Sequence, residues 1–70
     1  MDPLANTRWR SIWFDQIEYG DLFFVSGHLA MVTDVIEVSE TITNIQFEWM
    51  FNEGGGEFDL SNSTRFSVCR

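Results

Sequence analysis

The alternation of apolar and polar residues from Thr41 to Phe51 is the clearest pattern in the chain. The apolar positions of this segment are Ile45, Phe47, Trp49 and Phe51, and the intervening ones are Asn44, Gln46, Glu48 and Met50. A period of two over this length predicts a half-buried β-strand with one face toward a core and one polar face.

Two apolar runs before this segment predict two further strands. Leu22–Ser26 is short and suits a buried strand, and Leu29–Val38 is rich in β-branched residues. Between them, Gly27-His28 is a candidate two-residue hairpin turn, because Gly supplies positive φ. The apolar residues of Leu29–Val38 fall on both parities. This pattern fits a strand that is covered on both faces, or one with a bulge near Thr33-Asp34 that switches faces.

The rest of the chain alternates turns with short apolar pairs. Ser39-Glu40 predicts a turn, and Asn52–Glu57, with its three consecutive glycines, predicts a flexible loop. A turn over Ser61–Ser63 separates two last strands, one around Phe58 and Leu60 and the other around Phe66 and Val68.

The start of the chain has two competing interpretations. Asp2-Pro3 is a good helix start, with an N-cap residue followed by Pro at the first helical position. A spacing near 3.6 then favours a helix or helical turn within residues 3–17; its residues are Trp9, Ile12, Trp13 and Ile17. An extended arm competes with it, because Trp9, Trp13 and Ile17 also share one parity.

The segment Gly20-Asp21-Leu22-Phe23-Phe24-Val25-Ser26-Gly27, followed by Met31-Val32-Thr33-Asp34-Val35, resembles the opening hairpin of SH3-like small barrels. With about five strands in 70 residues, it implies one mainly β domain, an antiparallel five-stranded SH3-like barrel over residues 19–70. Residues 1–18 would form an N-terminal arm with a possible short helix. Peptide-binding barrels of this kind use an aromatic groove for proline-rich ligands. In this chain the residues that could form such a groove are Tyr19, Trp49 and Phe51.

Charge limits the class of partner. The chain has eleven Asp and Glu, four Arg and no Lys, for a net charge of −7. Nucleic-acid binding depends on cations that neutralise phosphates, and anionic membranes attract basic segments, so both partners are disfavoured. The related nucleic-acid-binding barrels carry basic loops, whereas this chain has Asp or Glu there. A negative field favours a partner with a basic surface, or serves solubility alone.

Other composition features point to a small cytoplasmic protein. Cys69 is the only cysteine, which excludes an intramolecular disulfide and fits a reducing compartment. No segment has the apolar length of a membrane span, and the start lacks a signal-peptide layout. Size and charge resemble the small acidic accessory proteins that viruses and phages direct against host machinery. On that interpretation the protein acts in the host cytoplasm.

Two groups of acids are candidate partner-binding residues. Glu53, Glu57 and Asp59 surround the glycines, where they form either a mobile acidic loop or a loop that orders against a basic partner. Their spacing is not that of a calcium-binding loop, so no metal or cofactor is predicted. Glu48, Glu37 and Glu40 would gather on one side of the sheet if its strands pair around Ser39-Glu40. That side is either an ordinary solvated face or a carboxylate array that imitates phosphates.

The aromatic residues near the N-terminus form the third candidate site. Trp9 and Trp13, with Arg10 and Phe14, either pack over an open barrel end or act as interface hot spots for homo-oligomerisation. His28 is the only histidine, and no nucleophile or acid–base pair accompanies it. The sequence therefore predicts a non-enzymatic acidic protein-interaction module, and the resemblance in size and charge suggests a phage-encoded inhibitor that binds a basic surface of a host nucleic-acid-binding protein. The alternative is a self-associating structural subunit.

Overall fold

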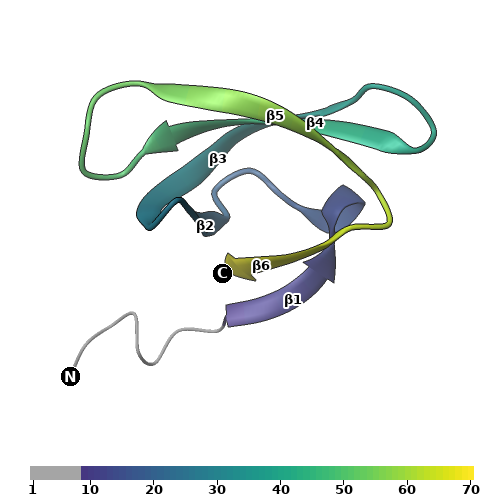
Figure 1. Cartoon of the computed structure of the whole chain (residues 1–70), viewed down its shortest axis with the longest axis horizontal. Helices are drawn as coiled ribbons and strands as arrows, with labels where there is room; N and C mark the ends of the chain where they lie inside the picture. Colours follow the sequence, from purple (N-terminus) through teal and green to yellow (C-terminus); the bar gives the residue numbers. More distant parts are fainter. Residues whose placement is uncertain (1–8) are drawn as a thin grey trace.

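In the computed structural model, which describes residues 9–70, one antiparallel sheet of six strands forms the molecule (Figure 1). The strands are β1 (Trp9–Trp13), β2 (Leu22–Val25), β3 (His28–Glu37), β4 (Ile42–Trp49), β5 (Gly55–Ser61) and β6 (Arg65–Cys69). Their order in the sheet is β1-β6-β2-β3-β4-β5. A single 3₁₀ turn, η1 (Phe14–Gln16), follows β1.

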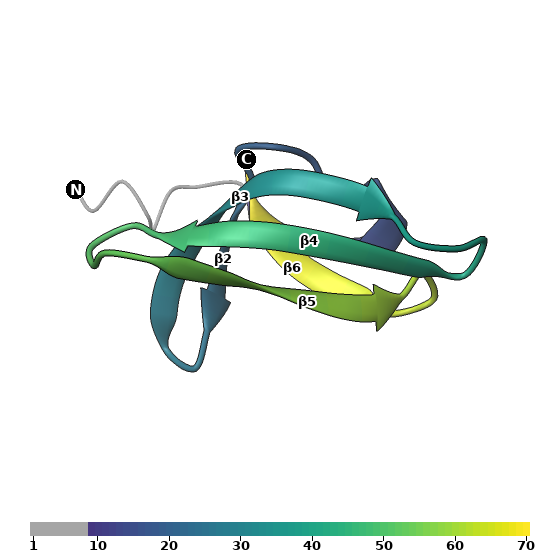
Figure 2. The ribbon, with the colours of Figure 1, turned by 90° about the horizontal axis from the view of Figure 1, so that it is seen from above.

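The sheet folds over on itself and encloses an aromatic core. Strands β3, β4 and β5 form one side, and β1 and β6 form the other (Figures 1 and 2). Five Phe rings from both sides contact one another, with centroids between 5.3 and 6.1 Å apart: Phe14, Phe23, Phe47, Phe58 and Phe66. Aromatic rings bury large areas, so this cluster gives a short chain a substantial core.

The sheet has six strands instead of the predicted five, and it is not closed. Strands β1 and β5 are its two edges. The additional strand comes from the segment for which a helix or an extended arm was predicted. Trp9–Trp13 is extended and pairs with β6 along its whole length, with Ile12 buried, and among residues 9–17 only η1 is helical. Residues 3–8 of the predicted helix lie outside the described residues.

Of the two interpretations of the third strand, the one with a bulge is confirmed. The register between β3 and β4 shifts between Val32 and Asp34, which leaves Thr33 as an extra residue. Before the shift Ala30 and Val32 face the core, and after it Val35 packs there. The bulge therefore explains why apolar residues of both parities reach the core, and it turns Asp34 to the outer side of the sheet.

The turn between β2 and β3 lies one residue earlier than predicted. Val25 pairs with His28, so the two-residue loop is Ser26-Gly27, and His28 begins β3. Both loop residues have positive φ, 50° for Ser26 and 82° for Gly27. These signs are those of the type I′ turn, whose twist matches the flanking strands.

The predicted glycine loop is shorter than expected, and β4 ends earlier. Gly55, Gly56 and Glu57 belong to β5 and pair with β4. A side chain at Gly55 would overlap the carbonyl oxygen of Phe47, so the glycines permit close strand contact here. Because β4 ends at Trp49, Phe51 lies in the following turn and is 81% exposed, so its predicted place in the strand is wrong.

Within residues 9–70, no helix has the length and apolar character needed to cross a membrane.

Candidate protein interface

The outer side of β3, β4 and β5 carries four carboxylates, Asp34, Glu48, Glu57 and Asp59, which we call the acidic face. Along β4, Thr43, Ile45 and Phe47 are buried, so the alternate residues Asn44, Gln46 and Glu48 point outward. Directly paired residues share a side of the sheet. The register places Asp34 and Glu57 on either side of Gln46, and Asp59 beside Asn44.

Two amides of β4 hold the carboxylates of β5. The Nδ2 atom of Asn44 donates to Oδ1 of Asp59 at 2.7 Å, and Nε2 of Gln46 donates to Oε2 of Glu57 at 3.5 Å. A side-chain amide carries no charge, so its hydrogen bond orients a carboxylate but does not neutralise the negative charge. Glu57 and Asp59 are two residues apart on one strand, a step of about 7 Å. The acidic face is thus an ordered set of charges.

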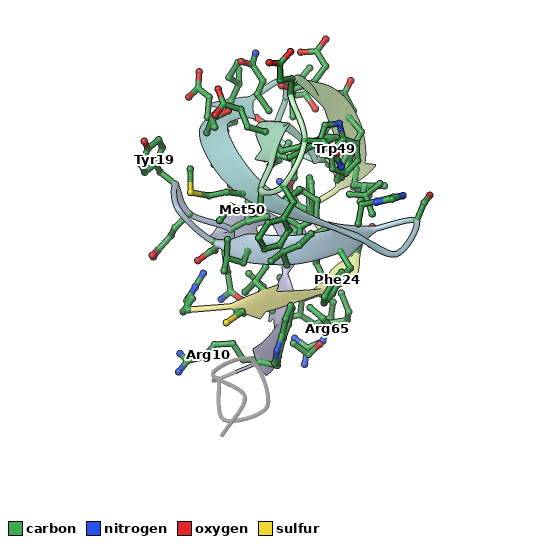
Figure 3. All side chains as sticks on the ribbon, turned by 90° about the vertical axis from the view of Figure 1, so that its left-hand side faces the viewer. Arg10, Tyr19, Phe24, Trp49, Met50 and Arg65 are labelled. Atoms are coloured by element: carbon green, nitrogen blue, oxygen red, sulfur yellow. The ribbon has the colours of Figure 1, made fainter. Side chains whose placement is uncertain are left out.

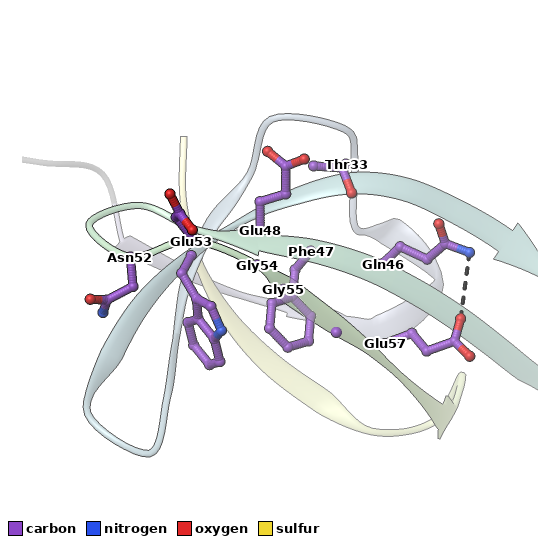
Figure 4. Close-up of a pocket in the computed structure, with 11 residues that line it drawn as sticks. Thr33, Gln46, Phe47, Glu48, Asn52, Glu53, Gly54, Gly55 and Glu57 are labelled. Atoms are coloured by element: carbon purple, nitrogen blue, oxygen red, sulfur yellow. Dashed lines mark hydrogen bonds between the residues drawn. The ribbon is translucent and has the colours of Figure 1, made fainter.

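A groove runs along one end of the acidic face, where the glycines contribute no side chains (Figure 4). Gly54, Gly55 and Gly56 line it together with Glu48, Glu53 and Glu57. In Figure 4, Glu48 extends from one side of β4 and Phe47 from the other. The groove therefore has acidic walls, and a long basic side chain is the group that fits its charge.

Arg10 and Arg65 lie away from the acidic face (Figure 3). No Lys or Arg occurs between Arg10 and Arg65, whereas every acid except Asp2 lies between Asp15 and Asp59. Arg10 belongs to β1 and Arg65 to β6, and Figure 3 shows both at the end of the molecule opposite a group of oxygen-bearing side chains. Charge is thus segregated along the molecule.

Arg70, the last residue, forms the one ion pair within residues 9–70. Its Nε donates to Oδ1 of Asp21 at 3.0 Å, and its Nη2 donates to Oδ2 of Asp21 and to the carbonyl of Gln16. The hydrogen bonds to Asp21 raise the pKa of Arg70 above its ordinary value. Consequently the four carboxylates of the acidic face have no ion-pair partner in the described part of the chain.

The structure brings together some of the predicted acids and separates others. Glu48, Glu57 and Asp59 lie on the acidic face, and Glu53 lines the groove in the loop beside it. Glu37 pairs with the buried Thr43 and therefore lies on the opposite side of the sheet. Glu40 lies in the β3–β4 turn, where its carbonyl accepts a hydrogen bond from Asn62. The expected gathering of Glu37 and Glu40 with Glu48 is wrong.

Sequence reasoning missed Asp34 as a member of the acidic face. The available signal was the bulge at Thr33-Asp34, because a residue that follows an extra residue changes side. No cluster of three or more His, Cys, Asp or Glu in residues 9–70 is arranged to hold a metal ion.

A second exposed surface lies on the outer side of β1, β6 and β2, and we call its residues Trp9, Trp13 and Phe24 the aromatic face. Trp9 stacks on Phe24 with ring centroids 5.4 Å apart, and the guanidinium of Arg65 lies 4.4 Å from the Trp13 ring centroid. Trp9 is 36% exposed, Trp13 44% and Phe24 53%. The two tryptophans therefore do not cover a barrel end as core residues.

The three candidates for a proline-binding groove are not brought together. Tyr19 and Trp49 lie on opposite sides of the molecule in Figure 3, and Trp49 packs against the core. Phe51 lies at a different small hollow with Phe24, Leu29 and His28. That hollow contains no carboxylate, and His28 contacts the Trp49 ring edge to face.

Comparisons of this chain with protein-family models, with curated proteins and with solved structures found no match.

Proposed function

We propose that this protein is a non-enzymatic interaction module that binds a basic protein surface through its acidic face. The observation that carries the proposal is the segregation of charge within residues 9–70, with four carboxylates that lack an ion-pair partner there on one side of the sheet and Arg10 and Arg65 at the other end of the molecule (Figure 3). Charges of one sign that lie together raise the local potential and attract an opposite surface. If the negative charge served only solubility, there would be no physical reason for the carboxylates and the arginines to be separated in this way.

The partner we propose is a protein that uses its basic surface to bind nucleic acid. Carboxylates at regular steps along β5, with neutral amides between the strands, present charges in rows as a phosphate backbone does. The acidic groove beside Glu53 supplies a place for one Lys or Arg side chain. Binding at that surface would exclude the nucleic acid, so the module acts as an inhibitor. Virus or phage origin and action in the host cytoplasm belong to the same proposal.

The SH3-like class is also part of the proposal. It is supported by the β2–β3 hairpin, which falls where the sequence resemblance begins, and by the neighbouring order of β2, β3, β4 and β5. If the fold belongs to this class, β1 is an additional strand that pairs with β6 outside the five strands of the barrel.

Affinity capture with a matched pair of variants tests the proposal. One variant neutralises the acidic face with Asp34→Asn, Glu48→Gln, Glu57→Gln and Asp59→Asn. The control neutralises four acids elsewhere, with Asp15→Asn, Glu18→Gln, Glu37→Gln and Glu40→Gln, and has the same net charge. Captured proteins are identified by mass spectrometry and then challenged with double-stranded DNA.

We expect the wild type and the control to capture the same basic protein, and the acidic-face variant to lose it. The complex should dissociate as salt rises from about 0.15 M to 1 M, since the screening length falls from about 8 Å to 3 Å. DNA should compete with the protein for its partner. Equal loss in both variants, or a complex that resists salt, would contradict a specific acidic interface.

A further inference from the structure

The β1 edge of the sheet is built to pair with a second copy of itself. Within residues 9–70, β1 pairs only with β6, so its other side is free. The amide of Phe14 donates to the carbonyl of Thr64 at 2.9 Å, which turns that amide toward the β6 side. Since backbone groups alternate along a strand, the amides of Trp9, Ser11 and Trp13 point away from β6.

An observed hydrogen bond agrees with this alternation. The amide of Trp13 donates to Oε1 of Gln16 at 3.0 Å, not to β6. The amides and carbonyls of Trp9 and Ser11 are then the groups that an added strand would use.

The sequence of β1 is chemically symmetric about its centre. It reads Trp-Arg-Ser-Ile-Trp, with Ser11 in the middle and a tryptophan at each end. An antiparallel pair of two copies centred on Ser11 places Trp9 opposite Trp13 of the second copy, on the exposed side of the sheet. Arg10 then lies opposite Ile12 of the second copy, so no like charges lie directly opposite each other. Self-complementarity of this kind is what a two-fold interface requires.

The opposite edge lacks this property. A pair of β5 strands centred on Phe58 would place Glu57 opposite Asp59 of the second copy, and like charges directly opposite are unfavourable. Charged side chains are a usual protection of exposed sheet edges. The strand β1 itself contains no acid, although the chain as a whole carries a charge of −7.

We propose that this protein forms a two-fold dimer in which β1 of one copy pairs antiparallel with β1 of the other around Ser11. The aromatic face then extends across both copies, and the acidic faces stay at the outer ends, so the dimer is bivalent for the proposed partner. The pairing does not depend on what the acidic face binds. On forming the dimer, the Trp13 amide exchanges Gln16 for the Trp9 carbonyl of the second copy.

Three variants test the pairing. Ser11→Pro removes an amide that points away from β6 and fixes a φ that an edge strand tolerates, so the fold is retained while the added strand loses its central hydrogen bonds. Ser11→Lys places two ammonium groups opposite each other and tests the same contact if the proline variant does not fold. Thr41→Lys, at an exposed position of the β3–β4 turn away from β1, is the control with the same change of charge. Gln16→Ala removes the competing acceptor of the Trp13 amide.

Sedimentation velocity in about 0.3 M salt, which screens the net charge, measures the dimer. The interface is short, so we expect a dissociation constant between about 10 μM and 1 mM. The dissociation constant should rise about tenfold or more for Ser11→Pro and Ser11→Lys, stay unchanged for Thr41→Lys and fall for Gln16→Ala. Hydrogen exchange of the Ser11 amide should slow as concentration increases, and that of the Asp59 amide, which points away from β4 at the other edge of the sheet, should not. A monomer at about 2 mM, or a dimer that both Ser11 variants leave intact, would overturn the proposal.

Discussion

Arg70 and Asp21 hold the end of the last strand against the loop that leads into β2. The two side chains share two hydrogen bonds, and Asp21 is almost fully buried whereas Arg70 is 25% exposed at its side chain. Asp21 also accepts the amide of Glu18, so one carboxylate joins the segment after η1, the start of β2 and the chain end. One of the four arginines of the chain therefore contributes to the stability of the fold.

Removing the arginine side of this pair should destabilise the fold. Arg70→Met leaves the Asp21 carboxylate buried without its partner, and we expect the free energy of unfolding to fall by about 2 kcal/mol. Arg10→Met is the control, because Arg10 is exposed and has no ion pair within residues 9–70. Urea unfolding measures both, and equal effects of the two substitutions would contradict this role.

The pH dependence of this contribution follows from the raised pKa of Arg70. A group whose pKa is higher in the folded state stabilises the fold fully below its unfolded pKa and loses that effect only as pH rises through the folded pKa. The difference between wild type and Arg70→Met should therefore be constant from about pH 6 to pH 9. Urea unfolding at several pH values checks this, and a decline of the difference within that range would be evidence against it.

The two glycines at the start of β5 should differ in their tolerance of a side chain. A Cβ atom at Gly55 would overlap the backbone carbonyl of Phe47, whereas at Gly56 it would lie 3.0 Å from the end of the Phe47 ring, a close contact with a side chain and not with backbone. We expect Gly55→Ala to lower the free energy of unfolding by about 3 kcal/mol and Gly56→Ala by about 1 kcal/mol. Chemical denaturation of both variants checks the order, and a reversed order would contradict the described strand contact.

The β2–β3 turn offers a stabilising substitution. Ser26 adopts a φ of 50°, in the left-handed region where Asn is more favourable than most residues. Ser26→Asn creates the Asn-Gly pair typical of type I′ turns, and we expect a gain of about 0.5 kcal/mol in stability. Thermal unfolding measures it. Ser63→Asn, in the β5–β6 turn, where φ is not positive, is the control and should give no such gain.

The strands that could be predicted from the sequence are those with a clear local pattern of apolar and polar residues. The alternation around Phe47 identified β4 and its outward residues, and the mixed parity of Leu29–Val38 indicated the bulge. The N-terminal strand was ambiguous, because Trp9, Ile12 and Trp13 satisfy both a helical spacing and an extended one. Pairing with β6, more than 50 positions away in sequence, decides between them.

The candidate site was predictable only in part. Glu48 follows from strand alternation, and Glu57 and Asp59 follow from their place beside the glycines. Which acids share a side depends on register, and a shift by one residue moves a side chain to the other face. Glu37 was therefore misplaced and Asp34 was missed, since both assignments depend on the extra residue Thr33.

Neutralising the acidic face should stabilise the free protein. The four carboxylates have no ion-pair partner within residues 9–70 and repel one another, so Asp34→Asn, Glu48→Gln, Glu57→Gln and Asp59→Asn together should raise the free energy of unfolding by about 1 kcal/mol at low salt. The gain should shrink as salt increases. Urea unfolding at two salt concentrations measures it. If the combined variant were less stable at every salt concentration, the carboxylates would have a role in folding instead.

The central claim, that the acidic face binds basic groups, is tested most directly by nuclear magnetic resonance with an oligolysine peptide as the probe. We predict that backbone amide signals of β3, β4 and β5 around Asp34, Glu48, Glu57 and Asp59 shift, and that those of the residues around Asp15 and Glu18 do not. The variant with a neutral acidic face should lose these shifts, and the control with equal net charge should keep them. Shifts distributed evenly over all acidic residues, or equal loss in both variants, would contradict the claim.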